Sequence, residues 1–501
     1  MLLCRPGACR VAAGACPAPE QSTSRAFGAA LPAWSAMPQC IAPRHAFLVA
    51  WCAGVVAMAG GYYWLVGMLE HFSGFPWLAC VAIAMIFYLY MGLIVGLWGF
   101  LVAWGARARW NLVLVGALAL MALEHVFPML FPAYLGASFH QLPALIQVAD
   151  LGGPLWLSGF LVAVSGALYM TLRAAWARQR RLRELGVVLA LTAAMLAYGH
   201  YRIGQVQAQA ARAARIRVGL VQANMGLLAK RQDPLEGLRR HVQQSQQLEA
   251  EVQPDLLIWP ESAFAWAVPS GVSNLKRYVT GPLRTALVFG GLSRRPPPPG
   301  AAAKRPRLYN TAFVLDAQGN VLGSYDKTFL LAFGEYLPGG ETFPWLYDLS
   351  PNSGRFTPGS RLQAVRWRQW RLGLLVCYED ILPSFVNALM HVSAPDVLIN
   401  LTNDAWFGDT HEPWIHLALA KFRAIEQHRD LVRATNSGVS AIIDALGRVQ
   451  SHSAVFTREN LHGEVRRMTG RTLFSRLGPW PGTLSLLALI GMALRLWRRR
   501  A

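Results

Sequence analysis

Six apolar stretches constrain the fold of this chain more than any other feature of its sequence. They lie at about 46–68, 77–104, 110–130, 155–172, 185–197 and 483–496. A helix needs roughly 20 apolar residues to cross the hydrocarbon core of a bilayer. The last two stretches are short, but tyrosine or tryptophan residues flank them, as is typical of the membrane interface. We therefore expect a bundle of about five transmembrane helices over 46–201 and a C-terminal transmembrane helix over 480–497.

The positive charge of the chain is concentrated in short loops between these stretches. The formal net charge is +20, and arginines cluster at 107–109, 173–183 and 495–500. The loops at 70–76 and 131–154 contain neither lysine nor arginine. Because basic loops stay in the cytoplasm, both termini are expected there, with residues 202–475 on the other side of the membrane. The same distribution argues against nucleic-acid binding, for which the sequence carries no aromatic and basic motif.

The first 45 residues form a separate N-terminal extension. They contain four of the seven cysteines among Arg, Ala, Gly and Pro residues. Since no apolar core of adequate length precedes a cleavage site, we predict no signal peptide. The extension is interpreted as poorly ordered, or as the result of a start site assigned too early. Its cysteines lack histidine and acidic partners, so a metal site is not predicted.

Residues 216–470 alternate strand-like and helix-like segments, which predicts an α/β domain inserted between the transmembrane helices. Strand-like segments lie at 216–222, 255–259, 287–291, 311–315, 371–377, 396–400 and 439–444, and helix-like segments at 234–253 and 415–430. The region has no internal repeat, no phosphate-binding glycine loop and no metal-ligand spacing. His411 and His416 lie near each other without a third ligand, so we expect them to be polar surface or pocket residues.

Three polar residues each follow a strand-like run in this region. Cys377 is its only cysteine and follows the apolar run 372–376, Glu261 follows 257–260, and Lys327 follows 323–326. A carboxylate can take the proton of a thiol, and an ammonium can stabilise the thiolate and an oxyanion. The three side chains would form a complete set for acyl transfer. A buried packing cysteine with surface Glu and Lys residues is the alternative, and spacing alone leaves both open.

Ordered motifs in this region resemble a known superfamily. The strings Trp259-Pro260-Glu261, Tyr325-Asp326-Lys327 and Cys377-Tyr378-Glu379 resemble the nitrilase superfamily, whose members have an αββα sandwich and a Glu-Lys-Cys triad. More narrowly, the chain resembles the apolipoprotein N-acyltransferase family. That closer resemblance rests on the strings at 143–153, 333–338, 400–408 and 433–438 and on the membrane stretches on both sides. The family usually begins with two further membrane spans, whose place residues 1–45 take here.

The resemblance implies a role for each site residue. Glu261 would be the general base, Lys327 the stabiliser of thiolate and oxyanion, and Cys377 the nucleophile. Glu335 would orient Lys327 or the incoming amine. Tyr378 and Glu379 would shape the thioester pocket, although core packing for Tyr378 and a structural salt bridge for Glu379 remain open. Glu124, inside the third apolar stretch, is either functional or engaged in a helix-capping or interhelix hydrogen bond.

The resemblance also implies a reaction and its partners. A phospholipid would donate an acyl chain to Cys377, and the N-terminal amine of diacylglyceryl-cysteine in an apolipoprotein would accept it. The protein would lie in the bacterial inner membrane with a periplasmic catalytic domain. Such an exchange needs no redox centre, so neither cofactor nor metal is expected. A membrane-anchored nitrilase-type amidase is the main alternative, and a non-enzymatic lipid-binding scaffold is a third.

Overall fold

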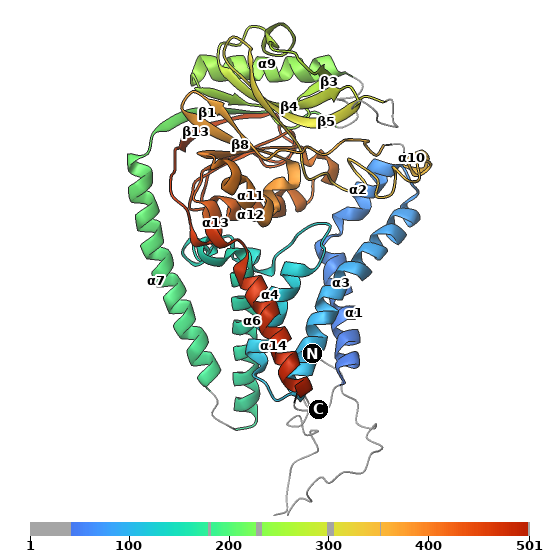
Figure 1. Cartoon of the computed structure of the whole chain (residues 1–501), viewed down its shortest axis with the longest axis vertical. Coiled ribbons are helices and arrows are strands. Elements are labelled where there is room, and N and C mark those ends of the chain that lie inside the picture. Colours follow the sequence, from blue (N-terminus) through green and yellow to red (C-terminus); the bar gives the residue numbers. More distant parts are fainter. Residues whose placement is uncertain (1–41, 179–181, 227–232, 298–304, 351, 499–501) are drawn as a thin grey trace, which may run out of the picture.

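The computed structural model describes residues 42–178, 182–226, 233–297, 305–350 and 352–498. The expected N-terminal extension therefore lies almost entirely outside the described residues. Within them, a bundle of apolar helices stands below an α/β domain, and the chain passes from the bundle to the domain and back (Figure 1).

The bundle contains the six expected apolar helices and one more. These are α1 (Pro43–Gly61), α2 (Trp64–Ser73), α3 (Trp77–Arg107), α4 (Leu112–Val126), α6 (Ala149–Trp176), α7 (Arg183–Arg212) and α14 (Trp480–Arg498). Among the described residues, α1, α3, α6, α7 and α14 are long and apolar enough to cross a membrane, and α4 is a shorter apolar helix. Between α4 and α6 lie two short segments, η2 (Leu135–Phe139) and α5 (Pro143–Ile146).

Two helices differ from the expected stretches. The first stretch, expected to reach residue 68, is broken after Gly61, and α2 begins at Trp64. The fifth, expected to end at Ala197, continues as a helix to Arg212. Residues with good helix propensity, chiefly Gln, Ala and Arg, carry it on by about 22 Å. Hydropathy therefore located the apolar half of α7 and missed its polar half.

The basic ends of the helices point away from the α/β domain. The C-terminal end of α6, the N-terminal end of α7 and the C-terminal end of α14 lie at the end of the bundle remote from that domain (Figure 1). The last turns of α6 and α14 carry Arg173, Arg495 and Arg498. This arrangement is the one that the positive-inside rule favours for a domain outside the cytoplasm.

The α/β domain is built on two sheets. The first has seven strands in the order β13-β1-β2-β4-β5-β6, with β3 also paired to β4, and the second has the order β12-β11-β10-β9-β8-β7. The strands of the first are β1 (Arg215–Gln222), β2 (Leu256–Ile258), β3 (Phe264–Pro269), β4 (Ala286–Arg295), β5 (Arg307–Leu315), β6 (Val321–Asp326) and β13 (Glu459–Arg466). Those of the second are β7 (Ala364–Trp367), β8 (Trp370–Val376), β9 (Val397–Thr402), β10 (Leu431–Thr435), β11 (Ala441–Ile443) and β12 (Val449–His452).

The sheets pack face to face between helices. Their inner faces share one apolar core, which includes Leu220, Val288, Leu374 and Ile399. Helix α9 (Pro234–Glu251) covers the outer face of the first sheet, where Leu248 joins a second core with Trp259. Helices α11 (Pro383–Ser393) and α12 (Glu412–Gln427) cover the second sheet on the side of the bundle (Figure 1). These four layers are the predicted αββα sandwich.

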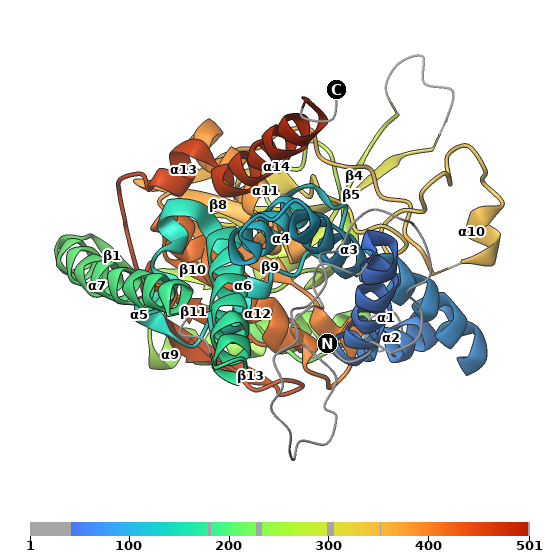
Figure 2. The same cartoon turned by 90° about the horizontal axis from the view of Figure 1, so that it is seen from below.

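Polar contacts join the bundle to the sandwich. Seen from below, α6 lies under α12 (Figure 2), and the two helices are in contact. The buried carboxylate of Asp150 on α6 accepts from Arg202 Nε at 2.6 Å and Tyr198 Oη at 2.8 Å, both on α7. His428, at the end of α12, places Nε2 3.4 Å from the same carboxylate. One aspartate therefore ties two membrane helices to the sandwich.

Aromatic residues form a second joint at the break between α1 and α2. The rings of Trp64 and Phe407 meet edge to face with centroids 5.1 Å apart. Tyr63 Oη lies 3.0 Å from His411 Nδ1. The break at Tyr62 thus places aromatic side chains where the segment after β9 can pack on them.

Close packing of α7 on α5 depends on Gly199, and we expect Gly199→Ala to destabilise the protein. A Cβ atom at Gly199 would lie 1.7 Å from Ala144 O, so the helices would have to separate. Overpacking of this kind costs about 1–3 kcal/mol. Gly204→Ala, on the same helix with nothing within 4 Å of its Cβ among the described residues, is the matched control. It should gain up to about 1 kcal/mol of helix propensity. Thermal unfolding in detergent, followed by tryptophan fluorescence, should separate the two variants, and equal transition temperatures would contradict the packing.

Candidate active site

Glu261, Lys327 and Cys377 leave the two sheets at strand ends. Strand β2 is parallel to β4, and β6 runs in the same direction as β4 because both are antiparallel to β5. Glu261 and Lys327 therefore emerge at the same edge of the first sheet. Cys377 directly follows β8 in the second sheet. All three side chains are buried, with relative exposures of 6%, 1% and 7%.

A glycine allows the Glu261 segment to lie against the first sheet. A Cβ atom at Gly290 of β4 would lie 2.6 Å from Glu261 Cα and 2.7 Å from Pro260 O. Such distances are shorter than real Cβ contacts, so any side chain at this position would push Glu261 outward. Gly290 accordingly sets how deep the carboxylate can sit.

The backbone of Cys377 is held in an unusual conformation. Its φ is +54°, in the left-handed region, at the start of the 3₁₀ turn η4 (Cys377–Ile381). Such a residue costs of order 1–3 kcal/mol and persists where the surroundings over-determine it. Asn400 Nδ2 donates to Cys377 O at 2.7 Å, and Val376 N donates to Glu379 Oε2 at 2.9 Å. These bonds fix both sides of the nucleophile candidate.

Lys327 lies between two carboxylates. Its Nζ is 2.7 Å from Glu335 Oε2 and 3.9 Å from Glu261 Oε1. Asn310, on β5, bridges the same carboxylates, since its Nδ2 donates to Glu261 Oε1 at 2.6 Å and to Glu335 Oε1 at 2.8 Å. Burial alone lowers the pKa of Lys327, but Glu335, Cys377 and Glu261 outweigh it and the net pKa is raised. Lys327 is therefore a permanent cation at neutral pH.

The thiol of Cys377 rests in its protonated form. Burial raises its pKa well above the ordinary value, the Glu261 carboxylate raises it further, and Lys327 opposes both. Because the thiolate is the reactive form, the sulfur must lose its proton during the reaction rather than before it. The charge of the Glu261 carboxylate raises the pKa of the thiol, so the two groups lie near each other. A carboxylate is a group that can accept this proton.

Glu379 organises the site by accepting four hydrogen bonds. Tyr325 Oη, Thr328 N and Phe329 N donate to its Oε1 at 2.8–2.9 Å, and Val376 N donates to Oε2. Burial raises its pKa to about 7. The four donors are uncharged O–H and N–H groups. Because they come from the end of β6, from the segment directly after it and from the last residue of β8, Glu379 ties the ends of these two strands together. Tyr378 packs partly buried against the core between the sheets, and burial raises its pKa to about 12.

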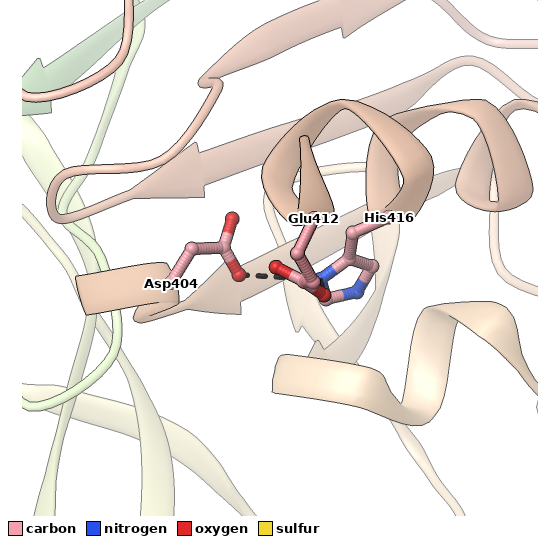
Figure 3. A group of neighbouring side chains, drawn as sticks. All are labelled: Asp404, Glu412 and His416. Carbon is pink, nitrogen blue, oxygen red and sulfur yellow. Dashed lines mark hydrogen bonds and ion pairs between the residues drawn. The ribbon is translucent and has the colours of Figure 1, made fainter. Parts of the chain in front are cut away.

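His416 is buried, and the prediction that it is a surface or pocket residue needs correction. Its Nδ1 lies 3.2 Å from Asp404 Oδ1 and 3.9 Å from Glu412 Oε1, and Figure 3 shows the three side chains pointing toward one another. Their donor atoms lie within 4.8 Å of one another, close enough for a metal ion. However, His416 Nε2 faces Asp380 at 2.8 Å, and Arg433 Nη2 holds the other oxygen of Asp404 at 2.8 Å. The group is therefore better described as an ion-pair cluster. His411 is exposed, as expected.

Glu124 makes a structural contact. It is buried on α4, and its Oε1 accepts from Leu135 N of η2 at 2.9 Å. This bond joins two segments of the bundle, which matches the interhelix alternative. The same residue lines a small cavity with His125, Tyr134 and Ser384, between the bundle and α11.

Sequence reasoning missed Asn310 and the partners of His416. Asn310 is a polar residue close to the apolar run 312–315 of the same strand, and that pattern was a usable signal. Asp380, Asp404 and Arg433 come from distant segments, and only the fold brings them together.

Comparison with known proteins confirms the predicted resemblance. A family model described as "Carbon-nitrogen hydrolase" matches residues 217–472. A second, described as "Apolipoprotein N-acyltransferase N-terminal domain", matches residues 13–168. Sequence similarity to that second family therefore begins inside the N-terminal extension.

Relatives in sequence agree with these matches. A protein of Geobacter metallireducens named apolipoprotein N-acyltransferase is 31% identical over 449 residues, which cover 87% of this chain and 84% of the relative. A protein of the same name from Azotobacter vinelandii is 32% identical over 480 residues, covering 92% and 88%. Nit3 of Saccharomyces cerevisiae, a member of branch 10 of the nitrilase superfamily, is 16% identical with a TM-score of 0.37, covering 50% of this chain and 90% of Nit3.

We expect the alkylation of Cys377 by iodoacetamide to report the charges around it. In the unmodified protein the rate should still be rising at about pH 9, because the thiolate is the reactive form. Glu261→Gln removes a negative charge that raises the thiol pKa, so the profile should move to lower pH. Lys327→Met removes a positive charge that lowers it, so the profile should move to higher pH. The Cys377→Ser protein gives the background from other thiols, and coincident profiles for both variants would refute the charge arrangement.

Glu379→Gln should lower the transition temperature of the protein. The glutamine oxygen can still accept from three donors, but its NH₂ group would face the N–H of Val376. An unsatisfied buried donor costs about 1–3 kcal/mol. Glu249→Gln is the control, since Glu249 Oε1 also accepts from two backbone N–H groups, of Arg284 and Thr285, at a partly exposed site. Thermal unfolding should show the larger loss for Glu379→Gln, and the reverse order would argue against its organising role.

Proposed function

Because this chain belongs to the apolipoprotein N-acyltransferase family, we propose that it moves a fatty acyl chain from a membrane phospholipid to the N-terminal amine of a diacylated lipoprotein, through a thioester on Cys377. The family provides the substrates, a lipid donor and a lipoprotein acceptor. The convergence of Glu261, Lys327 and Cys377 at neighbouring strand ends is the observation that supports this route for this chain.

In the first half-reaction, Cys377 takes the acyl chain. Glu261 accepts the thiol proton as the sulfur attacks the ester carbonyl of the phospholipid, so that a C–S bond forms. The negative charge that develops on the carbonyl oxygen is stabilised by the ammonium of Lys327. The C–O bond then breaks, and the proton held by Glu261 passes to the leaving oxygen, which releases a lysophospholipid.

In the second half-reaction, the acyl chain passes to nitrogen. The α-amino group of diacylglyceryl-cysteine attacks the thioester, and Glu261 takes a proton from the nitrogen. The C–S bond breaks, the proton returns to sulfur, and an amide is formed. Glu335 keeps Lys327 in place through the 2.7 Å ion pair. Lys327, which lies between Glu335 and Glu261, remains a cation in both steps.

The arrangement of the chain supports a location at the outer face of the bacterial inner membrane. The protein is a membrane protein, and the sandwich is inserted in the sequence between α7 and α14. Both helices carry basic residues at the end that lies far from the sandwich. With the basic ends in the cytoplasm, the sandwich lies on the periplasmic side. A long acyl chain could then stay partly in lipid, which avoids exposing its methylenes to water at about 0.8 kcal/mol each.

Acyl labelling tests the proposal directly. Purified protein incubated with a phospholipid that carries a labelled acyl chain should form an adduct that hydroxylamine cleaves, and a diacylglyceryl-cysteine peptide should then take the label as an amide. Cys377→Ala should form no adduct, because the nucleophile is gone. Cys52→Ala and Cys80→Ala, which remove the other free cysteines of the described residues, should retain it.

Two outcomes would contradict the proposal. An adduct on Cys377→Ala would exclude the thioester route. Release of the label as free fatty acid in the presence of the acceptor peptide, with no amide formed, would favour a hydrolase such as the membrane-anchored nitrilase-type amidase.

A further inference from the structure

A closed ring of four buried charged residues lies behind the nucleophile candidate. Arg433 donates from Nη1 to Asp380 Oδ2 at 3.0 Å and from Nη2 to Asp404 Oδ2 at 2.8 Å. His416 faces the remaining oxygens, with Nε2 2.8 Å from Asp380 Oδ1 and Nδ1 3.2 Å from Asp404 Oδ1. Each aspartate therefore contacts both basic residues. Their relative exposures are 0% for both aspartates and Arg433, and 4% for His416.

The ring closes in charge as well as in geometry. Two carboxylates, one guanidinium and one imidazolium sum to zero, and each oxygen of each aspartate has one partner in the ring. Glu412, whose Oε1 lies 3.9 Å from His416 Nδ1, is an outer neighbour, and burial raises its pKa to about 8. Although burial and Arg433 lower the pKa of His416, the two aspartates raise it to about 9, which agrees with an imidazolium at neutral pH. The cost of burying ions is offset only when all partners are present, and removal of one leaves an unpaired buried charge.

The ring joins the segments that surround Cys377. Asp380 lies in η4, three residues after Cys377, and Asp404 lies two residues after Thr402, at the end of β9. The Thr402 side chain lowers the pKa of the Cys377 thiol. His416 belongs to α12 and Arg433 to β10. The ring thus connects the turn that begins at Cys377 to the segment after β9, to α12 and to β10.

We propose that the ring of Asp380, His416, Asp404 and Arg433 is a positioning device that holds the Cys377 turn in its reactive geometry. The turn places a non-glycine residue at a φ of +54°, and such a conformation needs support from its surroundings. Asp380 supplies that support from the C-terminal side of the turn, as the bond from Val376 to Glu379 does from the N-terminal side. The ring residues act through the turn and touch no substrate. As a statement about catalysis, this proposal rests on the proposed function.

Two variants of the ring and one control test the proposal. Asp380→Asn and His416→Gln each leave a partner charge unpaired. Asp396→Asn is the control, because Asp396 is also buried and paired with arginine, through Arg371 at 3.2 Å, but lies at the opposite ends of β8 and β9. All proteins are compared well below their transition temperatures, so that any loss of rate is measured on folded protein.

Acylation by a labelled phospholipid and alkylation by iodoacetamide are the two readouts. In steady-state acyl transfer from the labelled phospholipid to the diacylglyceryl-cysteine peptide, we expect both ring variants to lose about 10- to 100-fold in kcat, because small displacements of a nucleophile have effects of this size. Their KM should stay within about twofold of the unmodified protein, as expected for a group that does not contact substrate. Alkylation of Cys377 should become faster, because a relaxed turn exposes the thiol. Asp396→Asn should match the unmodified protein in both.

The double variant Asp380→Asn/His416→Gln adds a test that a merely stabilising role would not pass. It removes an anion and a cation together, so its loss in kcat should be smaller than the product of the two single losses. Ring variants that resemble Asp396→Asn in acylation and alkylation would overturn the proposal, as would a loss confined to KM. If the unmodified protein transfers no acyl chain while the ring variants still change the alkylation of Cys377, the proposed function fails and the positioning role stands.

Discussion

The buried ammonium of Lys327 is the interaction on which the site depends. A cation with 1% exposure is stable only because two carboxylates lie beside it, at 2.7 and 3.9 Å. One of them, Glu335, belongs to the long segment after β6, so this segment must fold over the strand ends before the charge is compensated. The other, Glu261, is also the candidate base. The same electrostatic balance that allows Lys327 to be buried therefore places base, cation and thiol together.

The sandwich holds this group of charges by contacts from both sides. Above it, Asn310 and Gly290 set the position of Glu261 on the first sheet. Below it, Glu379 and the ring of Asp380, His416, Asp404 and Arg433 fix the turn after β8. The segment that carries Asp404 continues into Phe407 and His411, which pack on the break between α1 and α2. A continuous set of contacts thus runs from the membrane helices to the surroundings of the sulfur.

The sequence was sufficient for features that local patterns determine. Apolar runs located the membrane helices and the parallel strands. Polar residues directly after strands made Glu261, Lys327 and Cys377 candidates, and the family resemblance implied their roles. It was insufficient where structure depends on distant partners. The polar half of α7 has no apolar signal, although its helix propensity is good. His416 was taken for a surface or pocket residue because its partners Asp380 and Asp404, 36 and 12 positions away in the sequence, reach it only through the fold. The break after Gly61 had a local sign, the pair Gly60-Gly61, within an otherwise continuous apolar run.

The pairing of β1 with β13 has a consequence for how the chain is made. These strands are the first and the last of the sandwich, and Arg215 lies opposite Arg466. During synthesis the edge of β1 must stay unpaired until about 250 further residues have been added. An open strand edge invites pairing with other chains. Because α7 directly precedes β1, this open edge is held beside the membrane helices until β13 is made, just ahead of α14.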